Sequence, residues 1–126
     1  MVLSEVTVEL AKKLKQEVSF EDRIIGTMMS GAGGNNSVSI YSLQELVDFL
    51  FVDEYVKLFQ KGKSKISYIN LEEVVHWIEK VFGDTDLSNE INEVVNSNQS
   101  YVTKIEETCN LLKDRLKQCD EVLNMT

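Results

Sequence analysis

The sequence contains no proline, a single histidine and two cysteines. Proline is the strongest helix breaker, so its absence lets long helices run without interruption. One histidine and two isolated cysteines do not supply the ligands of a metal site, and we expect no metal and no cofactor. On one helix Cys109 and Cys119 would lie about 15 Å apart, too far for a disulfide. Free thiols in a reducing compartment are therefore expected.

The sequence also lacks long apolar runs and an excess of positive charge. No stretch approaches the roughly 20 apolar residues of a membrane span, and no charged start precedes an apolar run at the N-terminus. We therefore expect a cytoplasmic protein that does not insert into a membrane. Lys and Arg number 13 against 21 Asp and Glu, which gives a formal charge of −8. Such a chain as a whole repels nucleic acid, and only a local basic patch would bind it.

What the sequence does contain is apolar spacing typical of helices. Its 126 residues, 43% of them hydrophobic, suffice for one domain covering 1–126. We predict a mainly α fold, a bundle of five or six helices with a long, coiled-coil-like C-terminal helix or helix pair. The expected helices span about 5–17, with Ser4 as its cap, then 20–29, 43–60, 71–82 and 86–123.

Short polar motifs mark where several of these helices begin and end. Ser42 and Glu45 form an S-x-x-E capping box before the third helix. Asn70 and Glu73 frame the start of the fourth helix in the same way. Gly83 follows that helix at the position where a left-handed residue is favoured. These motifs set the predicted boundaries of the third and fourth helices.

The segment between the second and third helices has a different composition. Residues 30–37 are rich in glycine and asparagine, and we expect a flexible loop. No lysine follows the glycines, so the loop does not match a phosphate-binding motif. The stretches 38–41 and 66–68 have extended character and are predicted to pair as a minor two-stranded β element.

The last segment, 86–123, carries a heptad-like apolar pattern. The seam that this pattern defines comprises Leu87, Ile91, Val94, Asn98, Tyr101, Ile105, Leu112 and Leu116. The spacing keeps its phase across the segment, so we expect one continuous helix about 57 Å long, which would overhang a compact domain. A break within the polar stretch 96–100, which holds mediocre helix formers, is the alternative and would give two antiparallel helices.

An overhanging seam favours association, and 86–123 is therefore predicted to be an association helix. On this basis we expect a non-enzymatic adaptor or accessory subunit that binds a protein partner or itself as a homo-oligomer. Asn98 would be the polar residue that fixes register within the seam.

A nucleic-acid-associated subunit of the ribonucleoprotein type is the alternative function. Four lysines stand close together in this acidic chain, and aromatic residues flank them. Cations that alternate with aromatic rings suit phosphate contact and base stacking. The candidate contact residues are Lys57, Lys61, Lys63, Lys65 and Tyr68.

His76 is the one candidate for acid–base chemistry. Its unperturbed pKa lies near neutrality, and Glu72 and Glu73 precede it by four and three residues, on the same helix face. A solvated His–Glu pair on an amphipathic helix explains this arrangement. No nucleophile motif accompanies it, so no catalytic residue is predicted and the chain is not expected to be an enzyme.

Overall fold

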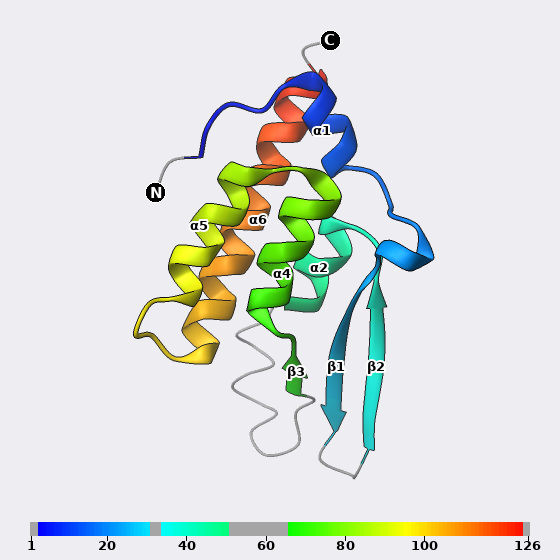
Figure 1. Ribbon diagram of the computed structural model, residues 1–126, viewed down its shortest axis with the longest axis vertical. Coiled ribbons are helices and arrows are strands. Elements are labelled where there is room, and N and C mark those ends of the chain that lie inside the picture. Colours follow the sequence, from blue (N-terminus) through cyan, green and yellow to red (C-terminus); the bar gives the residue numbers. More distant parts are fainter. Residues whose placement is uncertain (1–2, 31–33, 51–65, 125–126) are drawn as a thin grey trace.

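The computed structural model describes residues 3–30, 34–50 and 66–124 and shows a layer of helices beside a small antiparallel sheet (Figure 1). This confirms the predicted mainly α fold with a minor β element. Its elements are α1 (Val8–Leu14), β1 (Ile24–Ser30), β2 (Gly34–Ile40), α2 (Leu43–Leu50), β3 (Ile66–Tyr68), α4 (Leu71–Trp77), α5 (Thr85–Val95) and α6 (Tyr101–Asn124). A 3₁₀ turn (Phe20–Asp22) precedes β1, and a π-helical turn (Ile78–Phe82) continues α4.

The sheet has the strand order β2-β1-β3, and both pairings are antiparallel. The helix predicted over 20–29 is wrong, because β1 occupies Ile24–Ser30 and forms a hairpin with β2. The predicted pairing of 38–41 with 66–68 is also wrong, since β1 lies between those two segments. β1 ends at Ser30 and β2 begins at Gly34, both inside the stretch predicted as a loop over 30–37, so that prediction fails for Ser30 and for 34–37. Residues 31–33 lie outside the described residues.

Three of the predicted helix boundaries are confirmed. The Asn70 side chain accepts from the backbone N–H groups of Glu72 (2.9 Å) and Glu73 (3.4 Å) at the start of α4. The Ser42 hydroxyl accepts from the N–H of Glu45 (3.1 Å) at the start of α2. Gly83 ends the fourth predicted helix with a φ of 71°, the left-handed conformation that glycine adopts without strain. Local chemistry therefore sets these boundaries.

The first helix is shorter than predicted, and the third is described only in part. α1 begins after Thr7, whose hydroxyl accepts from the N–H of Leu10 (3.1 Å), so Ser4 is not its cap. α2 is described as far as Leu50, and the rest of the predicted helix, 51–60, lies outside the described residues.

The C-terminal segment is a helix pair, so the prediction of one continuous helix is wrong and its alternative is correct. α5 ends at Val95, α6 begins at Tyr101, and the two lie side by side and antiparallel (Figure 1). The Lys104 ammonium donates to the carbonyl of Val95 (2.7 Å), which satisfies an orphan acceptor at the end of α5. The connection falls within 96–100, where the sequence has mediocre helix formers.

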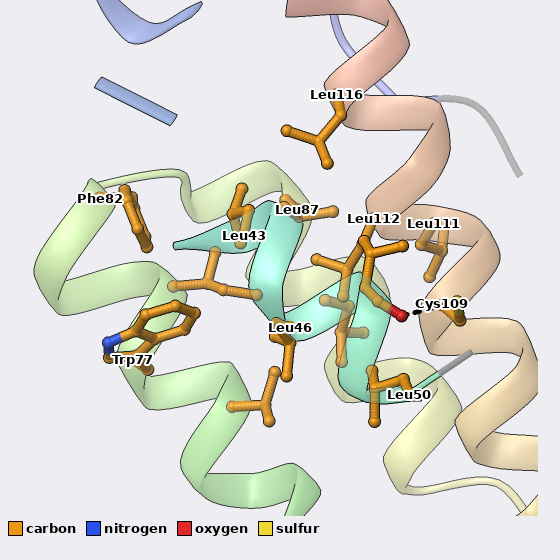
Figure 2. Packing of buried hydrophobic residues seen from close by; sticks show 14 of the residues in the cluster. Leu43, Leu46, Leu50, Trp77, Phe82, Leu87, Cys109, Leu111, Leu112 and Leu116 are labelled. Atoms are coloured by element: carbon orange, nitrogen blue, oxygen red, sulfur yellow. Dashed lines mark hydrogen bonds between the residues drawn. The ribbon is translucent and has the colours of Figure 1, made fainter. Parts of the chain in front are cut away.

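The core forms where α2, α4, α5 and α6 meet (Figure 2). Leu43 and Leu46 of α2 are fully buried against Leu112 of α6 and their neighbours. Trp77 and Phe82 meet edge to face with ring centroids 5.0 Å apart, a favoured aromatic geometry. Within the described ranges, no helix is long and apolar enough to cross a bilayer.

α2 also packs against the sheet. An added Cβ at Gly26 of β1 would lie 2.5 Å from Cζ of Phe49, so a side chain there would overlap the ring. Gly26 therefore allows the Phe49 ring of α2 to pack directly against the backbone of β1.

Candidate functional site

The aliphatic part of the predicted association seam lies inside the chain, whereas Tyr101, its aromatic member, is 36% exposed. Its six aliphatic residues are at most 7% exposed, and Leu87, Ile91 and Leu112 are fully buried. They form the inner face along which α5 and α6 pack onto the core. Asn98 is exposed in the connection between the two helices and therefore does not lie in a packed seam. The heptad spacing thus records packing within one chain, and the surface expected to be open is closed.

The predicted nucleic-acid contacts are only partly within the described residues. Lys57, Lys61, Lys63 and Lys65 lie outside them. Tyr68 ends β3 with 47% of its surface exposed. The structure therefore places the aromatic member of that predicted set and leaves the lysines as a sequence prediction.

Tyr68 belongs to an exposed group of side chains that the sequence did not bring together. Its ring stacks on that of Tyr101 with centroids 5.3 Å apart and planes inclined by 23°. Val102, the next residue of α6, is 54% exposed. We call Tyr68, Tyr101 and Val102 the tyrosine patch. It joins the end of β3 to the first turn of α6, which are 32 or more residues apart in the sequence.

The Tyr101 hydroxyl fixes the position of this patch. It accepts from the N–H of Ile69 (2.9 Å) and lies 3.2 Å from the carbonyl of the same residue, to which it donates. Ile69 is 1% exposed, so without the hydroxyl its polar backbone would be buried without these partners. Burial raises the pKa of Tyr101, which keeps the hydroxyl protonated and able to donate. The tyrosine patch therefore rests on a rigid support.

His76 lies exposed on α4 among glutamates, as its sequence position indicates. The two cysteines are both free and buried, and burial raises the pKa of each thiol. Protonated buried thiols are poor nucleophiles. Cys109 directs its sulfur to the carbonyl of Val47 at 3.9 Å (Figure 2). Among the described residues no group of three or more His, Cys, Asp or Glu side chains is placed to hold a metal ion.

A shallow groove of about 460 Å³ runs between α2 and α6. It is lined by Gln44, Val47, Asp48, Lys113, Leu116, Lys117 and Asp120. Two ammonium and two carboxylate groups balance one another on its walls. The Gln44 amide donates to Asp48 (3.1 Å), and Lys15 pairs with Asp120 (2.9 Å). The groove therefore favours neither sign of ligand charge.

A buried ion pair is the strongest polar feature of the described structure. Arg115 binds Asp84 through two hydrogen bonds, Nε to Oδ2 (2.7 Å) and Nη2 to Oδ1 (2.9 Å), and both side chains are 1% exposed. Nη1 of Arg115 donates to the carbonyl of Ser4 (2.7 Å) and to Gln118 (2.9 Å). Asp84 also caps α5 by accepting from the N–H of Leu87 (3.1 Å). Each charge therefore has several partners, as buried charges require.

The ion pair also fastens the N-terminal segment. The backbone N–H of Ser4 donates to Asp86 (2.7 Å), while the Ser4 carbonyl accepts from Arg115. The bonds from Ser4 lower the pKa of Asp86. Sequence reasoning missed the Arg115–Asp84 pair, because nothing local links residues 31 positions apart. The role of this network is to hold α5, α6 and the N-terminal segment together.

Comparisons with known proteins give no relative for this chain: no family model, no curated protein and no solved structure matches it. A function therefore has to be argued from the surface of the chain itself. Of the features described above, the tyrosine patch is the one that exposes large apolar side chains on a rigid support.

Proposed function

We propose that this chain is a non-enzymatic, cytoplasmic accessory subunit that acts through association with a protein partner at the tyrosine patch. The observation that carries the proposal is the exposure of Tyr68 stacked on Tyr101, with exposed Val102 next to Tyr101 in the chain. Most other large apolar side chains of the described residues are buried. Association at the start of α6 keeps the contact on the C-terminal segment, as the sequence predicted. It includes Tyr101 of the predicted seam but none of the buried aliphatic side chains of that seam.

The chemistry of the patch supports a protein partner. Tyrosine is enriched at the energetic centres of protein interfaces, because it offers a large apolar ring with a polar tip. The stack of Tyr68 on Tyr101 holds both rings in place before any partner arrives. Preorganised side chains lose little conformational entropy on binding, so a small patch contributes more affinity. The two free cysteines suit a reducing compartment such as the cytoplasm.

The proposal is tested by placing a charge in the patch without disturbing the fold. Val102 lies in the first turn of α6, where an acidic residue interacts favourably with the helix dipole, so Val102→Asp should fold normally. We expect it to lose partners that co-purify with the wild-type chain from its native source after nuclease treatment. Asn110→Asp adds the same charge at an exposed site on the same helix and should retain them. Equal partner recovery by both variants contradicts the proposal.

Nucleic-acid association is the second candidate, and one observation favours it. Tyr68 is exposed and stacked, and it follows the lysine-rich stretch 57–65 directly in the sequence. Rings of this kind form stacking platforms for bases, while nearby lysines contact phosphates. A net charge of −8 weighs against it and keeps it second.

Fluorescence anisotropy with single-stranded RNA and DNA separates the two candidates. Nucleic-acid binding predicts an affinity that falls steeply as salt rises, and that is lost when Lys61, Lys63 and Lys65 are all changed to Gln. Tyr68→Ala should weaken it further by removing the stacking ring. No binding at low salt, by the chain alone or with its partners, excludes this candidate.

A further inference from the structure

The outer edge of β2 differs from the other edge of the sheet. β3, at the opposite edge, has only three residues, and the Tyr101 hydroxyl binds both backbone groups of the next residue, Ile69. β2 has seven residues, all paired with β1 on one side. Within the described ranges, no strand pairs with its other side, and β2 is the outermost strand in Figure 1. Alternate N–H and C=O groups of such an edge strand point away from the sheet.

β2 has none of the features that normally protect an edge strand. Proteins prevent edge pairing with charged side chains, proline, β-bulges or very short strands. β2 contains no charged residue and no proline, and its register with β1 runs one to one from Ile24–Ile40 to Ser30–Gly34 without a bulge. The residue that follows the strand is bonded by another segment, since the N–H of Val18 donates to the carbonyl of Tyr41 (2.7 Å).

The absence of charge extends over the whole hairpin. Residues 24–40 contain no Asp, Glu, Lys or Arg, in a chain where these make up 27% of residues. Arg23 contacts β2 from the side of β1, where its Nε donates to the Ser39 hydroxyl (3.3 Å). Two copies of a chain with a net charge of −8 repel each other over most of their surface. The β2 edge is therefore the place where two copies can approach with least repulsion.

From these observations we propose that β2 pairs with β2 of a second copy, antiparallel across a twofold axis, to form one continuous sheet of two protomers. Full overlap of Gly34–Ile40 with itself places Ser37 opposite Ser37 at the axis and Gly34 opposite Ile40. A twofold contact of this kind uses the same patch on both copies. The edge is separate from the tyrosine patch, so this inference stands or falls independently of the proposed function.

The test compares a lysine placed on β2 at the proposed twofold axis with a lysine placed on the neighbouring strand β1. Ser37 is exposed, and its partner on β1 is Thr27. In the proposed dimer Ser37→Lys brings two like charges together at the axis, whereas Thr27→Lys keeps them about 14 Å apart, three strand spacings. Sedimentation velocity over a range of concentrations should show wild-type dimers. Ser37→Lys should raise their dissociation constant at least tenfold, and Thr27→Lys should change it less than threefold.

A cross-linking measurement checks the register with the fold kept intact. Both native cysteines are buried, so a cysteine introduced on the exposed face of the hairpin is the reactive one. Under mild oxidation Ser37→Cys should form a disulfide-linked dimer faster than Thr27→Cys. A strictly monomeric wild-type chain, or equal effects at the two positions, overturns self-pairing through β2. If Val102→Asp loses its protein partners but still dimerises, the tyrosine patch and the β2 edge are separate surfaces, and both proposals are supported.

Discussion

Removal of Arg115 should destabilise the protein far more than removal of any exposed charge. In Arg115→Met the Asp84 carboxylate stays 1% exposed and loses both bonds from the guanidinium, keeping only the N–H of Leu87. Breaking a buried ion pair by removing one partner costs about 3–5 kcal/mol, because it leaves an uncompensated buried charge. For a domain of this size such a loss lowers the melting temperature by about 10–20 °C.

The assay is urea unfolding followed by circular dichroism, with Lys117→Met as control. Lys117 is exposed on the same helix. Lys117→Met removes one positive charge but leaves no unpaired charge in the core, so the free energy of unfolding should change by less than about 0.5 kcal/mol. Asp84→Asn keeps an N-cap side chain for α5 but removes the carboxylate charge. The double variant Arg115→Met/Asp84→Asn should therefore lose less than the sum of the two single losses. Strict additivity, or a loss below about 1 kcal/mol for Arg115→Met, refutes this reasoning.

Further predictions concern single buried contacts, each measured by urea unfolding. Tyr101→Phe should cost about 1–3 kcal/mol, because it leaves the backbone of buried Ile69 without the hydroxyl. Burial raises the pKa of Tyr101, so the native state keeps a proton that the unfolded chain loses near pH 10. Stability should thus fall as pH rises through that value, less so in Tyr101→Phe. Gly26→Ala should cost about 1–3 kcal/mol, because its Cβ overlaps the Phe49 ring. Thr108→Val should stabilise by about 1 kcal/mol, because the buried Thr108 hydroxyl has no partner among the described residues. Unchanged unfolding midpoints in these variants would contradict the contacts assigned to them.

Features set by neighbouring residues could be predicted from the sequence. The caps at Ser42 and Asn70 and the left-handed Gly83 depend on residues within one helical turn, and the structure confirms all three. In the capping box the return bond differs in one detail, since the Glu45 carboxylate accepts from the N–H of Tyr41 (2.8 Å) rather than from that of Ser42. Helix ends are therefore readable because their hydrogen bonds are local.

Features set by distant residues could not be predicted. Ile24, Ile25 and Met28 have a spacing that fits a helix, but they form a strand because they pair with residues of β2 that lie 8 to 16 positions further along the chain. Short apolar segments follow their tertiary context more than their own propensity. The Arg115–Asp84 pair and the tyrosine patch each join segments about 30 residues apart, and a single sequence gives no sign of such pairings. The tyrosine patch was therefore not predicted as a unit. Tyr101 was assigned to the association seam, Tyr68 to the nucleic-acid contacts, and Val102 to neither.

The seam shows why spacing alone does not reveal whether a helix pairs within its chain or with another chain. Burial of its six aliphatic side chains stabilises either arrangement by about 9–18 kcal/mol. Keeping the five residues 96–100 helical costs only about 3 kcal/mol, so helix propensity does not decide between one continuous helix and a helix pair. Closure of so short a connection costs little entropy, whereas association of two chains costs about 4–15 kcal/mol in lost translation and rotation. Pairing of α5 with α6 within the chain is therefore favoured, and surfaces for association must be sought away from the buried aliphatic positions of the seam.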